Sequence, residues 1–330
     1  MREKRQPPVV SEGTARIDKE RSVPLLKHFG DERVSRIDAP AISNYQLVRA
    51  KLVSPRTVNL ELEFLRCVLK EAKVWERVVH DVKPLPENNT DNENGSRLGR
   101  ALDDAQEQLL FRTARSKPEW DAAFLAALAA ANTTMRGCEL KGLRLRHVNL
   151  MEREVNIRRS KTKKGNRDIP FNDGAMWAFA RLVERANALG SVQPDHFLFP
   201  RCLSRNTKVP NRQAGYDPTK PQKTWRSAWR SLVKETARRA AESITDERER
   251  QKAMAPFVGL RFHDLRHLAI TKLAESLASD QTIMSIAGHM DRKMMELYSH
   301  IRDDVKQKAV DAIRSYVPEE IPVPATQRVQ

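Results

Sequence analysis

The sequence has few cysteines and no long apolar run, and both shortages exclude classes of protein. Among its 330 residues there are three cysteines, Cys67, Cys138 and Cys202, which lie far apart and lack the spacing of a disulfide framework or a zinc site. No apolar run approaches the roughly 20 residues that a membrane span requires, and the charged first residues lead into no apolar signal segment. We therefore expect a cytoplasmic protein without a structural metal.

Motifs for nucleotide and metal chemistry are also missing. The sequence contains no Walker loop, and no cluster of Asp and Glu indicates a two-metal nuclease site. It has no internal repeat and no low-complexity tract. These absences disfavour P-loop NTPases, metal-dependent nucleases and repeat architectures.

Positive charge, in contrast, is present in excess. Lys and Arg number 59 against 43 Asp and Glu, which gives a formal net charge of +16. Residues 1–96 hold 17 basic and 15 acidic side chains, so almost the whole excess falls in the rest of the chain. A basic surface of this size suits a polyanion, of which nucleic acid is the obvious one, although an anionic membrane or simple solubility would also account for it.

Helical patterns dominate the N-terminal part of the chain. Residues 14–29 carry apolar side chains at helical spacing, and Pro24 is expected to kink or split this helix. Further helices are predicted to start near Asp38 and at Ser54, where a capping residue precedes a proline in the first turn. Residues 84–100 are polar and rich in turn formers without periodicity, which predicts a linker.

The part after this linker combines helices with short strands. Three strands are predicted over residues 147–150, 155–157 and 167–171, and a turn joins the last two. Residues 201–222, rich in Pro, Asn and Arg, are expected to form an ordinary surface loop. The predicted fold class is therefore mainly α with a small antiparallel β-sheet, and the length of the chain allows two domains.

One stretch of this second part has the composition of a phosphate site. In Arg261-Phe262-His263-Asp264-Leu265-Arg266-His267, His263 and Arg266 stand three residues apart. A helix would project both from one face near its start, where free backbone N–H groups favour an anion. An isolated His-x-x-Arg is more often part of a core helix with solvated polar residues, so this motif by itself decides little.

Four further elements accompany the motif in a fixed order. Upstream stand Thr134-Met135-Arg136-Gly137-Cys138-Glu139-Leu140 and the basic turn Ser160-Lys161-Thr162-Lys163-Lys164-Gly165. Downstream stand Gly288-His289 and, nine residues after that histidine, Tyr298. The order of Arg, Lys in a hairpin, His-x-x-Arg, Gly-His and Tyr resembles the tyrosine recombinases, the phage-type integrase family. Each element alone has an ordinary structural explanation, but their joint occurrence makes a chance resemblance improbable.

The resemblance implies a division of the chain into functional parts. Residues 1–83 would form a helical core-binding domain that clamps DNA, and residues 84–100 would link it to an integrase-type α+β catalytic domain over residues 101–317, followed by a tail over residues 318–330. The usual first helix of the clamp is hard to identify ahead of Thr14, which leaves open a domain shortened at its start. Whether the tail packs in cis or on a neighbouring subunit also stays open.

The resemblance further implies three residues that act directly on the scissile phosphate. Arg136 and Arg266 would clamp it, because a guanidinium is always charged and donates two parallel hydrogen bonds. Tyr298 would be the nucleophile. Glu139 is expected to orient Arg136 rather than to react.

Proton transfers would involve three more residues. His263 would accept the proton of the tyrosine, and His289 would bond a phosphate oxygen. Lys161 would protonate the leaving 5′-oxygen as a general acid, because its like-charged neighbours favour the neutral amine. His267, one step beyond Arg266, is expected to face another side of the helix.

These roles imply a site-specific DNA recombinase, an integrase of a phage or another mobile element, that works through a covalent 3′-phosphotyrosine link. Because the link retains the energy of the broken bond, the reaction needs neither ATP nor a metal, and we expect no cofactor. The expected partners are double-stranded DNA, further copies of the chain in a homotetramer on paired sites, and accessory DNA-bending proteins. When bound to DNA the protein would be associated with the nucleoid.

Two other functions stay open at this point. A type IB topoisomerase-like enzyme would relax DNA by the same chemistry without pairing two sites. A DNA-binding regulator would keep the fold and lack catalysis, although the presence of all five elements counts against it.

Overall fold

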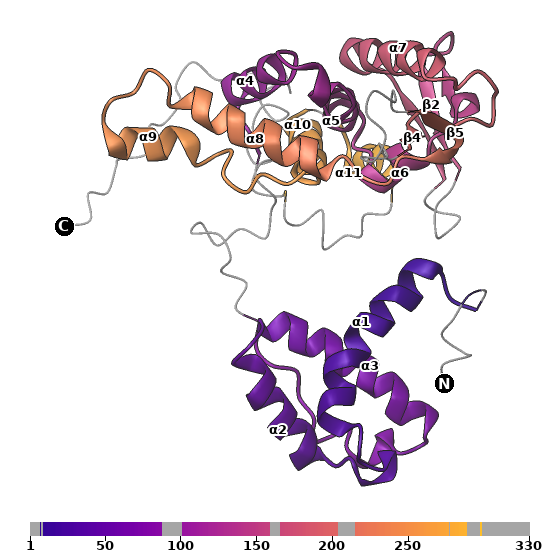
Figure 1. Cartoon of the computed structure of the whole chain (residues 1–330), viewed down its shortest axis with the longest axis vertical. Helices are drawn as coiled ribbons and strands as arrows, with labels where there is room; N and C mark the ends of the chain where they lie inside the picture. Colours follow the sequence, from indigo (N-terminus) through magenta and orange to yellow (C-terminus); the bar gives the residue numbers. More distant parts are fainter. Residues whose placement is uncertain are drawn as a thin grey trace, which may run out of the picture. The chain divides into compact units, whose positions relative to one another are not determined.

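The computed structural model describes residues 7, 9–87, 101–158, 166–203, 215–276, 278–288 and 298. The chain divides into two compact units, Met1–Ser96 and Arg97–Gln330 (Figure 1). Within the ranges that the structure describes, none of the helices is long and apolar enough to cross a membrane.

The first unit is helical. Its elements are α1 (Glu12–Phe29), the 3-10 turn η2 (Val34–Arg36), α2 (Ala39–Ala50), α3 (Pro55–Glu71) and the 3-10 turn η3 (Trp75–Arg77). The side chains of Ser11, Asp38 and Ser54 cap the three α-helices, each by accepting a hydrogen bond from a backbone N–H three residues on. The helix starts predicted at Asp38 and Ser54 are thus confirmed.

Pro24 does not split α1. The helix continues without a break from Glu12 to Phe29, so the predicted division at this proline is wrong. A proline inside a helix removes one backbone hydrogen bond. Leu25 and Phe29 follow it on the face that packs into the core of this unit, and their burial holds the helix together across the missing bond.

The second unit is built around α5. Its helices are α4 (Asp104–Ala114), η4 (Pro118–Trp120), α5 (Asp121–Thr133), α6 (Gly137–Gly142), η5 (Leu145–His147), α7 (Asp173–Ala188), α8 (Arg226–Ala240), α9 (Glu247–Met254), α10 (Asp264–Glu275) and α11 (Asp280–Ala287). Alanines make up much of α5 and most of them are buried, so neighbouring helices approach it closely on several sides. It contacts α4, α7 and α10, which makes it the centre of the core (Figure 1).

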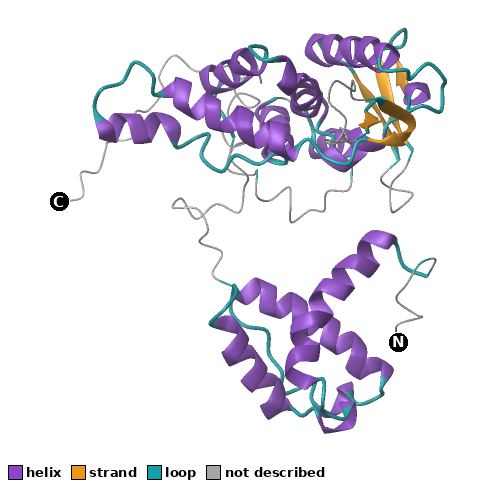
Figure 2. Ribbon diagram, in the orientation of Figure 1, coloured by secondary structure: helices purple, strands orange, loops and turns teal. Residues whose placement is uncertain are grey.

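A small antiparallel sheet lies at one end of this unit (Figure 2). Its strands are β1 (Val148–Asn149), β2 (Glu154–Ile157) and β3 (Arg167–Pro170), paired in that order. In the register of β2 and β3, Val155 faces Ile169 and Ile157 faces Arg167. The predicted strands and the fold class, mainly α with a small antiparallel sheet, are confirmed.

A second pair of strands was not predicted. β4 (Pro200–Cys202) and β5 (Tyr216–Pro221) pair antiparallel, so the expectation of an irregular surface loop over residues 201–222 is wrong at both ends of that range. Two prolines in β5 argue against a strand only where both edges of the strand must donate hydrogen bonds. In β5 the carbonyl of Pro218 still accepts a hydrogen bond from the N–H of Phe197 at 2.9 Å, and the register shifts between Pro200 and Arg201, so the pair tolerates both prolines.

Candidate functional site

The Arg136 segment begins where α5 ends. Thr134 caps α5 in the left-handed region, at φ +58°, which a β-branched residue seldom adopts. The turn directs the carbonyl of Thr134 to the guanidinium of Arg266, whose Nη1 donates a short hydrogen bond to it. Such strain persists only where the surroundings fix the backbone, and here the α5–α6 turn is fixed against α10.

Glu139 holds Arg136 in place, as predicted. The backbone N–H of Arg136 donates to Oε2 of Glu139 at 2.8 Å, and Nη1 of the same arginine donates to Oε1 at 3.1 Å. Arg136 is the N-cap of α6, and Glu139 lies in the first turn of that helix. The two contacts together fix both the backbone and the side chain of Arg136.

Arg167 of β3 is a second partner of Glu139 that sequence reasoning missed. It is buried, and its Nη1 and Nη2 donate to the two oxygens of Glu139 at 3.2 and 3.0 Å. Burial alone would raise the pKa of Glu139, but the hydrogen bonds from Arg167 and Arg136 outweigh burial and lower it. A signal for Arg167 existed, because strand alternation puts this residue on the same inward face as Ile169.

Arg167 also ties the sheet to the end of α11. Its Nε donates to the carbonyl of Ile286 at 2.8 Å, and the hydroxyl of Thr134 donates to the same carbonyl at 3.3 Å. Gly288 follows with φ +67°, and a Cβ built on it would lie 2.7 Å from Nη1 of Arg167. Only glycine fits this position, which directly precedes His289 in the chain.

The predicted His-x-x-Arg motif forms the start of α10. His263 is the N-cap residue and is exposed, whereas Arg266 is buried, with 4% of its surface accessible. Burial and then the positive charge of Arg136 lower the pKa of Arg266 to about 10, which leaves the guanidinium protonated at neutral pH. Although part of His263 is exposed, partial desolvation of its ring and then the positive charge of Arg266 lower its pKa.

The loop before α10 is fixed by its own contacts. The buried carboxylate of Asp264 accepts hydrogen bonds from the backbone N–H and from Nη2 of Arg261, both at 2.8 Å. The indole N–H of Trp229 in α8 donates to the carbonyl of Leu260 at 3.0 Å. These bonds define the position from which His263 and Arg266 project.

Tyr298 lies fully buried beside α10 and α11. Its ring packs in a cluster with Ile270, Ala274, Ile283 and Ala287. Burial raises the pKa of the phenol to about 12, although the positive charge of Arg266 acts against this rise.

His267 contacts this tyrosine, against expectation. Its Nδ1 lies 2.8 Å from the Tyr298 hydroxyl oxygen, so this residue, which was expected only to face another side of the helix than Arg266, contacts the predicted nucleophile. Periodicity relative to Arg266 could not locate a partner 31 residues further along the chain. Burial lowers the pKa of His267 to about 4, and His263 adds to that effect, so the imidazole is neutral at neutral pH.

Four of the six predicted site residues are therefore grouped in one place. Arg266 bonds to Thr134, two residues before Arg136, and His267, which bonds to Tyr298, has its ring 5.2 Å from that of His263. The other two predicted site residues, Lys161 and His289, lie outside the described residues.

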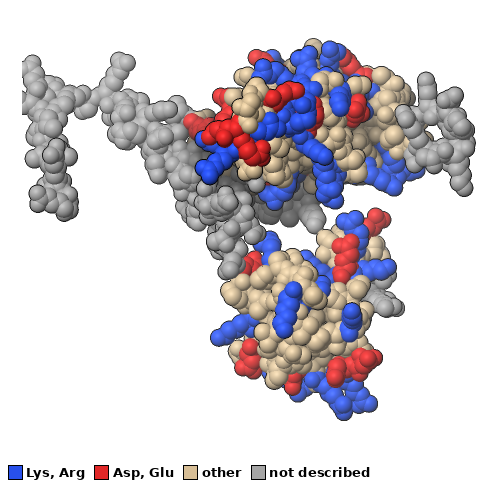
Figure 3. All heavy atoms as spheres, turned by 60° about the vertical axis from the view of Figure 1, so that its left-hand side comes forward, with Lys and Arg blue, Asp and Glu red and all other residues tan. Residues whose placement is uncertain are grey.

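A groove of about 860 Å³ adjoins this group. His263 and Gly137 lie on its wall together with aromatic residues of α8 and of the loop before α10. Basic side chains also line it, namely Lys141, Arg226, Arg230, Lys234 and Arg261. Lys and Arg spread over the face of this unit that Figure 3 shows. In the described part of the chain, no three His, Cys, Asp or Glu side chains are grouped as metal ligands.

Residues 100–304, which include all six predicted site residues, match the sequence model of the phage integrase family. The chain belongs to the phage integrase family. The predicted family is thereby confirmed. The predicted enzyme class, a tyrosine-type site-specific DNA recombinase, is confirmed as well. No curated protein matches the sequence.

Solved structures of integrases share the fold. The integrase of the Tn1549 transposon, in complex with transposon right-end DNA, superposes with a TM-score of 0.68 at 18% identity, over 94% of this chain and 96% of that one. A lambda integrase dimer bound to a COC′ core site gives 0.56 at 16% identity, over 96% and 94%. A lambda integrase tetramer bound to a Holliday junction gives 0.54 at 16% identity, over 86% and 73%. At such low identities the similarity concerns the fold.

Proposed function

We propose that this recombinase cuts and rejoins duplex DNA through a covalent 3′-phosphotyrosine link at Tyr298, with Arg136 and Arg266 as the phosphate clamp. The observation that carries the proposal is the state of Arg266. Its guanidinium is buried and held by the carbonyl of Thr134, and the repulsion from Arg136 and Arg167 exceeds the attraction of Glu139. A bound anion would relieve this repulsion.

The clamp suits a transition state that gains negative charge. Attack at phosphorus adds charge to the non-bridging oxygens, and two guanidiniums can each donate paired hydrogen bonds to them. Thr134 orients Arg266 and Glu139 orients Arg136 before the substrate arrives. Preorganised donors of this kind contribute about 3 to 4 kcal/mol each to transition-state stabilisation.

The remaining roles follow the family pattern. Tyr298 supplies the nucleophilic oxygen, and Lys161 protonates the 5′-oxygen that leaves. His289 bonds a phosphate oxygen, beside the turn that Gly288 forms. His263, exposed at the start of α10 and repelled by both clamp arginines, also faces the phosphate.

The substrate in this proposal is duplex DNA of a mobile element. The basic groove next to His263 supports a path for the DNA backbone along α8. The integrase relatives named above bind transposon right-end DNA, a core site and a Holliday junction. By analogy we propose a homotetramer on paired sites, with residues 1–83 as the DNA clamp, 84–100 as the linker, 101–317 as the catalytic domain and 318–330 as the tail, assisted by accessory DNA-bending proteins.

A trapping assay tests this proposal. The protein is incubated, without metal or ATP, with a library of nicked duplexes, and the mixture is denatured. Because a short fragment diffuses away from a nicked site after attack, the covalent intermediate accumulates. Tyr298→Phe is the matched control, since it removes only the nucleophilic oxygen.

The expected result is a protein–DNA adduct that forms without metal and is absent in Tyr298→Phe, while that variant still binds DNA. An adduct that persists in Tyr298→Phe would reject the nucleophile. Relaxation of supercoiled DNA that carries a single site, without any joining of two sites, would point instead to a topoisomerase-like enzyme.

A further inference from the structure

We propose that His267, rather than His263, accepts the proton of the Tyr298 hydroxyl during strand cleavage. The inference rests on the proposed function, in which Tyr298 is the nucleophile. It assigns a catalytic role to a residue that the motif pattern had placed outside the site.

The geometry of the hydroxyl supports this assignment. Its oxygen lies 2.8 Å from Nδ1 of His267, and the tyrosine ring is fully buried. Among the residues that the structure describes, His267 is the hydrogen-bond partner of this hydroxyl. A general base must lie within about 2.6–3.2 Å of the group whose proton it removes, and His267 meets this requirement before any DNA is bound.

His263 occupies a different position. It stands four residues earlier, at the exposed start of α10, with its ring perpendicular to that of His267 and 5.2 Å away between centroids. It lines the basic groove, whereas the buried tyrosine lies on the side of His267. His263 is therefore placed to contact the DNA, and His267 contacts the nucleophile.

The charges around His267 explain how it can act as a base. The groups facing it are His263, Asp264, Arg261 and Arg266, and only the aspartate favours the protonated ring. In the DNA-free protein His267 is therefore neutral and can accept a hydrogen bond at Nδ1. A phosphate bound at Arg266 would offset part of the positive charge and make the imidazole more basic when the proton must move.

The step balances without a further reactant. The O–H bond of Tyr298 breaks and its proton moves to Nδ1 of His267. The phenolate oxygen forms a bond to phosphorus as the bond from phosphorus to the 5′-oxygen breaks. The 5′-oxygen takes a proton from a separate donor, proposed to be Lys161, and on rejoining His267 returns its proton to the tyrosine.

Two substitutions separate proton transfer from positioning. In His267→Asn the amide oxygen lies close to the place of Nδ1, so it can still hold the hydroxyl but cannot take its proton. His267→Ala removes both capacities and leaves room for added imidazole. His263→Asn is the matched control one turn earlier on the same helix.

The measurement is the rate of adduct formation on a nicked duplex in a single turnover, over a range of pH. We expect His267→Asn to be slower by about 10² to 10⁴ and to lose the acidic limb of the wild-type pH profile, with His263→Asn retaining that limb. Imidazole should accelerate His267→Ala. Melting temperatures and DNA binding show whether each variant is folded.

A second substrate locates the defect. If sulfur replaces the 5′-oxygen that leaves, the leaving group needs no proton, and a variant that lacks only the general acid recovers. The His267 variants should stay slow on this substrate, because their defect lies at the nucleophile.

The outcomes distinguish the inference from the proposed function. An absent wild-type adduct would reject the function itself. A wild-type adduct together with a normal rate and pH profile in His267→Asn would overturn the role of His267 alone, as would recovery of the His267 variants on the sulfur substrate.

Discussion

Both units of the chain hold an arginine–carboxylate pair inside the fold, Arg49 with Glu61 and Arg167 with Glu139, but the second unit also buries Arg266. In the first unit Glu61 is buried and accepts hydrogen bonds from Tyr45 at 2.6 Å and from Arg49 at 2.9 Å. In the second unit the buried Arg266 is held by the carbonyl of Thr134, and the repulsion from Arg136 and Arg167 is only partly offset by Glu139. A charge that is buried with its partner serves the fold, whereas one that is buried amid like charge awaits a ligand.

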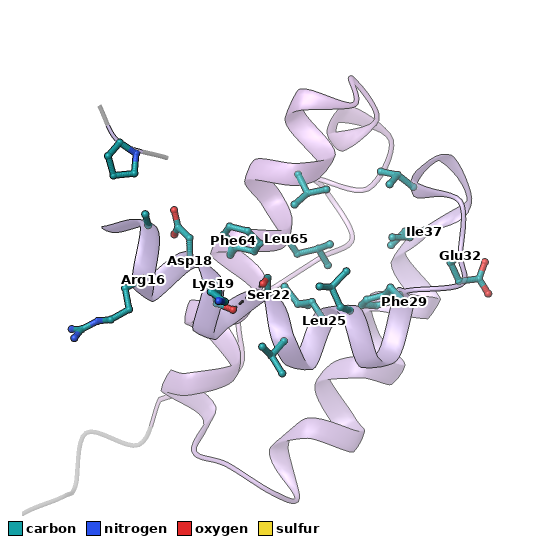
Figure 4. Close-up of a pocket in the computed structure, with 16 residues that line it drawn as sticks. Arg16, Asp18, Lys19, Ser22, Leu25, Phe29, Glu32, Ile37, Phe64 and Leu65 are labelled. Carbon is teal, nitrogen blue, oxygen red and sulfur yellow. Dashed lines mark hydrogen bonds between the residues drawn. The ribbon is translucent and has the colours of Figure 1, made fainter. Parts of the chain in front are cut away.

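The two units also differ in the charge on the walls of their grooves. A groove of about 830 Å³ runs along α1 in the first unit, lined by apolar side chains such as Leu25, Phe29 and Leu65, with Arg16 and Glu32 toward its rim (Figure 4). The groove beside His263 is similar in volume but has basic side chains on its wall. Volume alone does not distinguish the two, and charge does.

The largest effect is expected at Arg167. Arg167→Met removes the more buried of the two arginine partners of Glu139 and breaks the bond to Ile286, and it should destabilise the second unit by about 3–5 kcal/mol. Thermal unfolding measures this effect. The double variant Arg167→Met, Glu139→Gln should recover part of the loss, because the charge that lost its bonds to Arg167 is then absent.

The matched change in the first unit is Arg49→Met, which removes the arginine partner of the buried Glu61. It should lower stability without changing the rate of adduct formation in the folded protein. If Arg167→Met also left that rate unchanged, Arg167 would not position the clamp, and the comparison between the two pairs would fail.

Arg266→Gln should have the next largest effect. Loss of one clamp guanidinium should slow adduct formation by about 10² to 10³ and leave DNA binding largely intact, because the interaction strengthens in the transition state. The same variant should lose less stability than Arg167→Met, because the loss of the bond to Thr134 is partly offset by removal of a charge that Arg136 and Arg167 repel. A stability loss as large as that of Arg167→Met would mean that Arg266 serves the fold.

The sequence predicts features that depend on neighbouring residues better than contacts between residues far apart in the chain. Helix starts at Asp38 and Ser54 are local, since a cap and a proline suffice, and both were confirmed. The contact of His267 with Tyr298 was missed because helical periodicity gives the direction of a side chain but not the distant segment that packs against it. Strand alternation placed Arg167 inward, but nothing local reveals that Glu139 and Ile286 would meet it there.

The smallest effect is expected in the apolar groove of the first unit. Val23 and Leu26 of α1 line it with 61% and 59% of their surfaces exposed. Leu26→Ser should change stability by less than about 0.5 kcal/mol, whereas Leu65→Ala, buried in the same groove, should cost about 2–5 kcal/mol. Both variants, when folded, should form adduct at the wild-type rate.

The groove prediction is sharpest when cleavage and joining are measured separately. Adduct formation on one nicked duplex needs DNA binding and the site in the second unit, whereas joining two duplexes also needs contacts between protein copies. If Leu26→Ser formed adduct normally but no longer joined two duplexes, the groove would be an interface between protein copies. An apolar groove without a buried charge would then be functional. An unchanged joining rate would show that the apolar surface of Leu26 is not needed for contacts between protein copies.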